Sequence, residues 1–333
     1  MRLRVVLAVA VVLLLSYGVV LGWRYVRHKA GLAIQTAIAD IEAAGLPQFE
    51  VARETKIIRP AGDRRLTIED PAGRVEVLPG GADITAEFTI YARGKDKADA
   101  ARRAEAIQFD IGPDPRAGHE IRAFVPEGKQ WPSGVSVDFK VTVPPQTALT
   151  VRVSSADARV TGVSGGVVVE SASGDVSVTD GPGPVTASTA SGDIRVTGAR
   201  ARTEVNASSG DIYLSDIVGT VSAHTSSGDI SLSQAATQEL TASSASGDIS
   251  LTLTAPFSGV GDVQSASGDL TLALPPGSDC RVRATTVSGT ISASVDLKQR
   301  LHEGRTMTGR LGAGRGSLDM SATSGDIALH PAG

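Results

Sequence analysis

The chain has 333 residues, a net charge of −4, one cysteine and 4% aromatic residues. A single cysteine excludes an intramolecular disulfide and a metal site built from several thiolates. Residues 151–333 carry 12 lysines and arginines against 18 aspartates and glutamates, a net charge of −6, which argues against a nucleic-acid partner.

The first expected element is a membrane anchor. Val5 to Trp23 is an uncharged run of 19 residues, about 28 Å as a helix, close to the thickness of a bilayer core. We expect residues 1–29 to form an uncleaved signal anchor and transmembrane helix, although Val20-Leu21-Gly22 or the small residues near Ala30 would also suit cleavage. Basic residues flank the run on both sides, so charge alone leaves the orientation open.

A spacer and a β-rich region are expected next. Residues 30–59 are assigned to a juxtamembrane helical spacer, because residues 30–44 are rich in alanine and isoleucine and are followed by Gly45 and Pro47.

Residues 60–147 are expected to form a β-rich capping region that covers the first coil of the repeats described next. This region contains a polar helical stretch from Lys95 to Ile107. Its alternating, strand-like runs are Leu66–Ile68, Val75–Leu78, Ile84–Ile90, His119–Val125 and Val135–Val143.

The rest of the chain repeats Ser-Gly-Asp followed by Val, Ile or Leu. The glycines of this motif are Gly174, Gly192, Gly210, Gly228, Gly247, Gly268 and Gly325, with a Ser-Gly-Thr-Ile variant at Gly289. The first four glycines are each 18 residues apart, and later spacings are 19, 21, 21 and 36 residues. A fixed period predicts a solenoid, because one unit cannot bury its apolar face without its neighbours.

Apolar residues return two and four positions after each glycine, and a second pair stands seven and five positions before it. The pairs that follow the glycines are Val176/Val178, Ile194/Val196, Ile212/Leu214, Ile230/Leu232, Ile249/Leu251, Leu270/Leu272 and Ile327/Leu329. Both pairs alternate with polar residues, which predicts two short strands per unit, each with one buried face.

The predicted fold is therefore all-β: a parallel β-helix or β-roll-like solenoid with about 18 residues per coil, from residue 148 to 330. Each strand should pair in parallel with its equivalent one coil later, giving a rod about 45 Å long at about 4.8 Å per coil. The longer spacings should be loops at the corners.

The Ser-Gly-Asp corner admits two interpretations. Glycine supplies the positive φ of a tight turn, and the flanking serine and aspartate can bind nearby backbone amides, which is a structural role. Stacked aspartates also resemble, loosely, a calcium-binding β-roll, although the second glycine pair of that repeat is missing. We favour the structural interpretation and predict that backbone amides offset the repulsion between stacked carboxylates.

The pattern as a whole resembles the bacterial putative adhesin family. The resemblance rests on the opening Leu66–Ile68 and Gly73–Val77, the polar helical insert, the Ser-Gly-Asp coils, and the closing Gly312–Leu318 and Thr323–Ile327. It covers about residues 60–330. It implies a β-solenoid domain of unknown function, with membrane-anchored members at the cell envelope, and supplies no catalytic residues.

We find no catalytic constellation in the repeats. The five histidines, His28, His119, His224, His302 and His330, are scattered without ligand spacing. Cys280 is interpreted as a small filler, and Arg281 and Arg283 beside Asp279 as ordinary surface. We therefore assign no catalytic, cofactor-binding or metal-binding residues, and we expect that the protein is not an enzyme.

The expected function is a membrane-anchored, extracytoplasmic module that binds an envelope protein or glycan, or serves a structural role. Its outer faces carry many hydroxyl groups, at Thr186, Ser188, Ser222, Ser231, Thr241, Ser243 and Ser250. One alternative is an accessory or sensing component of an envelope-stress or signalling system. A further alternative is a polysaccharide-acting enzyme, since such enzymes also use parallel β-helices.

Overall fold

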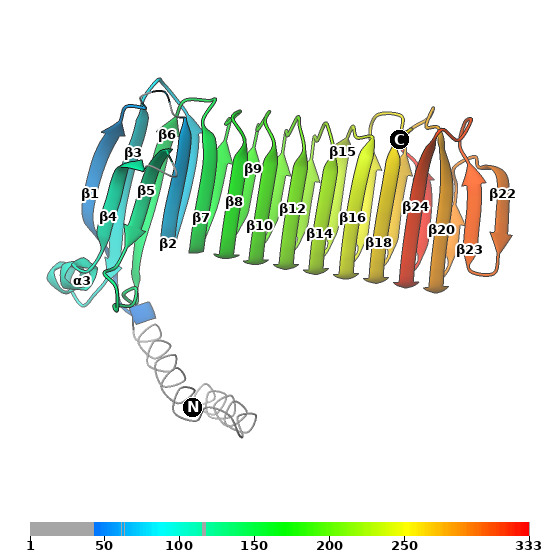
Figure 1. Ribbon diagram of the computed structural model, residues 1–333. Coiled ribbons are helices and arrows are strands. Elements are labelled where there is room, and N and C mark those ends of the chain that lie inside the picture. The colour runs from blue at the N-terminus through cyan, green and yellow to red at the C-terminus, as the bar shows by residue number, and fades with distance from the viewer. Residues whose placement is uncertain (1–42, 61, 63, 115–117, 333) are drawn as a thin grey trace, which may run out of the picture.

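The computed structural model describes residues 43–60, 62, 64–114 and 118–332. The predicted anchor at 1–29 and residues 30–42 of the predicted spacer lie outside these ranges. Within them, every helix is too short or too polar to span a bilayer. The described chain forms one rod of stacked strands (Figure 1).

Most coils of the rod contribute one long and one short strand, which lie in two facing layers (Figure 1). The long strands are β8 (Val167–Ser173), β10 (Val185–Ser191), β12 (Thr203–Ser209), β14 (Val221–Ser227), β16 (Glu239–Ser246), β18 (Val260–Ser267), β20 (Cys280–Ser288) and β24 (Gly316–Ser324). The short strands are β9 (Val176–Thr179), β11 (Ile194–Thr197), β13 (Ile212–Ser215), β15 (Ile230–Ala235), β17 (Ile249–Leu253), β19 (Leu270–Leu274), β21 (Ile291–Ala293) and β25 (Ile327–Pro331).

Successive coils are joined by parallel pairing between equivalent strands. Ile194 lies opposite Ile212, which in turn lies opposite Ile230, so the register advances by 18 residues per coil. The predicted parallel stacking is confirmed for the middle of the rod, from β8 to β19.

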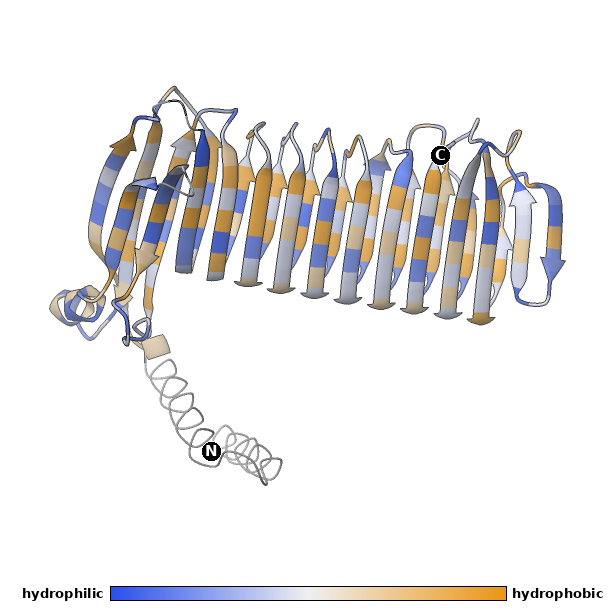
Figure 2. Ribbon diagram, viewed as in Figure 1, coloured by the Kyte–Doolittle hydropathy of each residue, from blue (hydrophilic) through white to orange (hydrophobic). Residues whose placement is uncertain are grey.

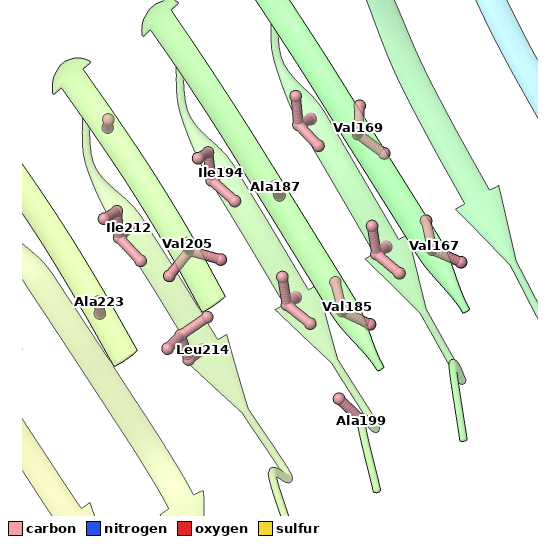
Figure 3. Close-up of a cluster of buried hydrophobic side chains, with 14 of the residues drawn as sticks. Val167, Val169, Val185, Ala187, Ile194, Ala199, Val205, Ile212, Leu214 and Ala223 are labelled. Atoms are coloured by element: carbon pink, nitrogen blue, oxygen red, sulfur yellow. The ribbon is translucent and has the colours of Figure 1, made fainter. Parts of the chain in front are cut away.

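The core lies between the two layers. Figure 2 shows apolar and polar residues alternating along the strands, and Figure 3 shows the apolar side chains of both layers, such as Ile212 and Val205, in the space between them. Ile212 and Val205 are 0% exposed and Leu214 is 1% exposed. The inward positions predicted from the alternation are therefore confirmed for this part of the rod.

The first coil comes earlier than the predicted start of the solenoid near residue 148. It is the single strand β2 (Arg65–Pro79), which pairs in parallel with β7 (Ala148–Thr161) and brings Gly73 opposite Ala156. Both strands run through the corner without a break and present the same inward pattern as later coils. The separation of 83 positions between Gly73 and Ala156 obscures the period in the sequence.

A cap covers the first coil. Two strands, β5 (Gly118–Phe124) and β6 (Val135–Val143), pair in parallel with the two halves of β2. Antiparallel strands then extend each layer. These are β4 (Gln108–Asp114), which pairs with β5, and β3 (Ile84–Arg93) and β1 (Gln48–Ile58), which follow β6. The helix α3 (Lys97–Ala104) confirms the polar helical stretch in this region.

Aromatic residues fill the cap, where the repeats use aliphatic ones. The rings of Phe88 and Phe109 stack at 4.2 Å, and Phe139 lies 6.1 Å from each. The cap also includes part of the expected spacer 30–59. Within that spacer, residues 48–58 form β1, an edge strand paired with β3, and not a helix.

The coils at the other end are stacked out of chain order. β24 pairs in parallel with both β18 and β20, so the coil of Gly325 lies between the coils of Gly268 and Gly289 (Figure 1). The prediction that each strand pairs with the next coil in sequence is wrong here. The reason is a hairpin, β22 (Lys298–Glu303) and β23 (Thr306–Arg310), which occupies the outer edge of β20 in antiparallel pairing. Only the inner edge of β20 is then free for β24.

Candidate ligand-binding surfaces

The repeated aspartates form a continuous series of hydrogen bonds along the rod. In each coil the aspartate N–H donates to Oδ1 of the aspartate in the coil below it, at 2.8–3.1 Å. The series runs through Asp157, Asp175, Asp193, Asp211, Asp229, Asp248, Asp269 and Asp326, and ends where the Thr290 N–H donates to Asp326. The predicted contacts between backbone amides and the stacked carboxylates are therefore confirmed.

The glycine of each corner is required by close backbone contact. Gly210 has φ +151°, and a Cβ atom there would stand 1.9 Å from the carbonyl oxygen of Gly192 in the coil below. No side chain fits in the space at Gly210, so this corner can stack on the one below it only with glycine. The repeated Ser-Gly-Asp motif is thus accounted for by stacking.

The far oxygens of the aspartates have their own contacts in places. Tyr213 donates its hydroxyl to Oδ2 of Asp211 at 2.9 Å, and this bond raises the pKa of the tyrosine. The Arg195 guanidinium lies over the Tyr213 ring, 4.7 Å from its centroid. In the described part of the chain, no three His, Cys, Asp or Glu side chains are grouped so as to hold a metal ion.

The long strands present rows of short polar side chains to the outside. In one row, Thr186, Glu204, Ser222 and Thr241 stand opposite one another on successive strands; a second row holds Ser188, Asn206, His224 and Ser243. All of these side chains are partly exposed. The short strands also carry outward hydroxyl groups, including those of Ser231 and Ser250. The predicted outward placement of these hydroxyl groups is confirmed.

The structure does not bring the histidines together. His224 bridges Ser222 and Ser243 within the polar rows of the long strands. His119 is buried in β5, His302 lies on the exposed β22, and His330 contacts Ser294 at the end of β25. His28 lies outside the described residues.

Cys280 is the first residue of β20, and Asp279 directly precedes it. The thiol is buried, and burial raises its pKa to about 11, so it is protonated at neutral pH. The Asp279 carboxylate accepts the Nε–H of Arg315 at 2.5 Å and the N–H of Gly314, and the arginine is the main reason that its pKa falls to about 2.

Sequence reasoning missed one feature at this end of the rod. Arg310 on β23 lies directly opposite Arg281 on β20, and both line a cavity with Arg283. The regular spacing of the repeats gives no sign of it, because the hairpin that carries Arg310 interrupts that spacing.

Three solved structures align with most of the chain. A putative adhesin from Bacteroides fragilis has 12% identity and a TM-score of 0.40, covering 84% of this chain and 97% of that one. A putative lipid-binding protein from Parabacteroides distasonis has 14% identity and a TM-score of 0.44, covering 83% and 96%. A putative adhesin from Parabacteroides merdae has 12% identity and a TM-score of 0.36, covering 83% and 95%. No curated protein matches the chain in sequence.

A family pattern matches the sequence more directly. The Toastrack domain of unknown function DUF4097 matches residues 126–330, which is more than half of the chain. The match spans the parallel coils from β7 onward and the hairpin end described above. On this ground the chain belongs to the Toastrack DUF4097 family.

Proposed function

We propose that this protein is a non-enzymatic binding module of the cell envelope, tethered by residues 1–29, whose long-strand face docks a protein or a glycan. The observation that carries the proposal is the pair of polar rows across β10, β12, β14 and β16. Because parallel coils repeat about every 4.8 Å, these rows offer donors and acceptors at a fixed spacing.

The surface suits recognition for an energetic reason. Serine and threonine side chains have few rotamers, and here they stand on strands held on both sides by neighbouring coils, so little conformational freedom is lost on binding. The face is also free of positive charge along much of its length, since residues 203–279 contain no lysine or arginine. A ligand would be selected by hydrogen bonds at repeated spacing.

The tether and the export of the rod belong to the same proposal. The apolar run from Val5 to Trp23 is long enough to span a bilayer. A domain that needs no disulfide can fold on either side of the membrane. Protease added to intact cells or spheroplasts should digest residues 60–333. Digestion only after lysis would contradict the extracytoplasmic location.

The docking face is tested by a matched pair of surface variants in the full chain. The triple variant Thr186→Lys, Ser222→Lys, Thr241→Lys places three bulky charges on the long-strand face. The triple variant Ser231→Lys, Ser250→Lys, Thr271→Lys places three on the short-strand face. Affinity capture from native membranes should lose its specific partner with the first set and keep it with the second.

Equal capture by both sets would refute the docking face. Turnover of any member of a carbohydrate panel by the purified chain would refute the non-enzymatic role. If capture returns a histidine-kinase or other signalling component, the module belongs to the accessory or sensing class.

A further inference from the structure

We propose that the hairpin end of the rod holds a binding site for a phosphate group. A cavity of about 420 Å³ opens there on the strands β20, β23 and β24, with Gln299 of β22 at its margin. Three arginines are among the residues that line it, namely Arg281, Arg283 and Arg310. This site lies at the opposite end of the rod from the β1–β6 cap (Figure 1), and it does not depend on the docking face proposed above.

The arrangement of the arginines is unfavourable without an anion. Arg281 and Arg310 lie directly opposite each other on the antiparallel strands β20 and β23, and like charges in such a pair repel. Arg283 is two residues along β20 on the same face, so it adds a third positive charge to the same area. A bound oxyanion would attract all three arginines and so offset their mutual repulsion.

The protein itself supplies little compensation. Within the described residues, none of these three arginines forms an ion pair within 4.0 Å of a carboxylate. The nearest acid in sequence, Asp279, is occupied by Arg315, as described above. Asp319, opposite Arg283 on β24, is the one acidic residue that lines the cavity. The Nε–H of Arg310 is buried and has no hydrogen-bond acceptor.

The charge of this end contrasts with the rest of the rod. Residues 280–315 hold seven lysines and arginines against two acids, whereas residues 203–279 hold nine acids and no lysine or arginine. An anion approaching the rod is therefore repelled by its middle and attracted to the cavity. The positive charge is concentrated at one place in a chain whose net charge is −4.

The number of donors favours phosphate over carboxylate. Each guanidinium offers five N–H donors in a planar fork, so three of them exceed what the two oxygens of a carboxylate can accept. A phosphate monoester presents three terminal oxygens and close to two negative charges at neutral pH. Its charge also matches the cavity, in which three arginines face one aspartate.

The test measures phosphate binding to the full chain in a neutral detergent by calorimetry at about 0.15 M salt, where charges outside the cavity are screened. Glycerol phosphate is the soluble probe, and a short-chain phosphatidic acid dispersed in the same detergent is the lipid probe. Arg281→Gln and Arg310→Gln should each weaken binding by about tenfold, the usual effect of one charge-assisted bond. Arg305→Gln removes the same charge from the hairpin turn outside the cavity and should change affinity less than about twofold.

A gain-of-function variant makes the test independent of damage to the fold. Asp319→Asn removes the one carboxylate that lines the cavity and should strengthen binding severalfold. Binding of the soluble probe indicates a free phosphorylated ligand as the source, and binding of the lipid probe alone indicates a headgroup. The proposal is overturned if neither probe binds, if Arg305→Gln weakens binding as much as Arg281→Gln does, or if Asp319→Asn has no effect.

Discussion

The corner glycines give the sharpest prediction about stability. In Gly210→Ala the new methyl group would meet the backbone carbonyl of Gly192 at 1.9 Å, and backbone of the coil below cannot move aside as a flexible side chain would. Relief requires the two coils to separate by more than about 1 Å, which weakens the Gly192 N–H bond to the Ser209 carbonyl and the Asp211 N–H bond to Asp193. Two such bonds and the strained φ together cost about 3–5 kcal/mol.

Gly304→Ala is the matched control. Gly304 also has a positive φ, +59°, but nothing lies within 4 Å of the position that its Cβ would occupy. Its substitution should cost only the left-handed backbone penalty, about 1 kcal/mol. Urea denaturation of both variants, followed by circular dichroism, measures the difference. If Gly210→Ala is no more destabilising than Gly304→Ala, the contact between coils does not explain the repeated glycine.

Three further predictions concern single side chains. Ile212→Asp would bury a carboxylate between the layers and should lower the unfolding free energy by several kcal/mol, whereas the outward Ser231→Asp should change it by less than about 0.5 kcal/mol; equal melting temperatures would contradict the inward assignment. Asp211→Asn and Asp229→Asn keep an oxygen acceptor for the next amide, so each should leave the unfolding free energy unchanged or lower it by about 1 kcal/mol. A chelator should leave the melting temperature unchanged. A large stabilisation by millimolar calcium that these variants abolish would instead support the cation-binding interpretation. The pKa of Asp279 is depressed to about 2, so its contribution to stability is complete above the unfolded pKa of about 4 and is lost as pH falls toward 2. Asp279→Asn should flatten this part of the profile of unfolding free energy against pH. An unchanged profile would exclude the Arg315 contact as its cause.

The local pattern was enough to predict the middle of the rod. Residues such as Ile212 and Leu214 alternate with polar neighbours at a fixed distance from a glycine, and a parallel stack is the arrangement that buries all of them at once. The hydrogen bonds of the aspartates were also foreseeable, because stacked carboxylates need donors and each corner exposes a backbone amide.

The ends of the rod could not be predicted in the same way. The coils of Gly289 and Gly325 have the same local pattern as the others, and pattern alone does not say which equivalent strand is the neighbour. Thr290 stands where the other coils have aspartate, and its coil is the last of the hydrogen-bonded series. A carboxylate is not needed there as an acceptor, because none of the described aspartate amides follows it. The cluster of Arg281 and Arg310 depends on where the hairpin docks, which no repeat spacing encodes.

The coil of Gly325, which lies between the coils of Gly268 and Gly289, imposes an order of assembly. A stack whose coils follow one another in the chain can grow from its N-terminal side as the polypeptide is made, each coil being added to a finished surface. Here that growth stops at β18 and β19, because the next neighbour in space, β24 with β25, is synthesised after β20, β21 and the hairpin. The strands β20 to β23 therefore have no pairing with β18 and β19 until residues 316–331 are synthesised and pair with both parts. The arginine-lined end of the rod is therefore the last part to become complete, and a chain interrupted before Gly316 would leave both β18 and β20 with unpaired edges.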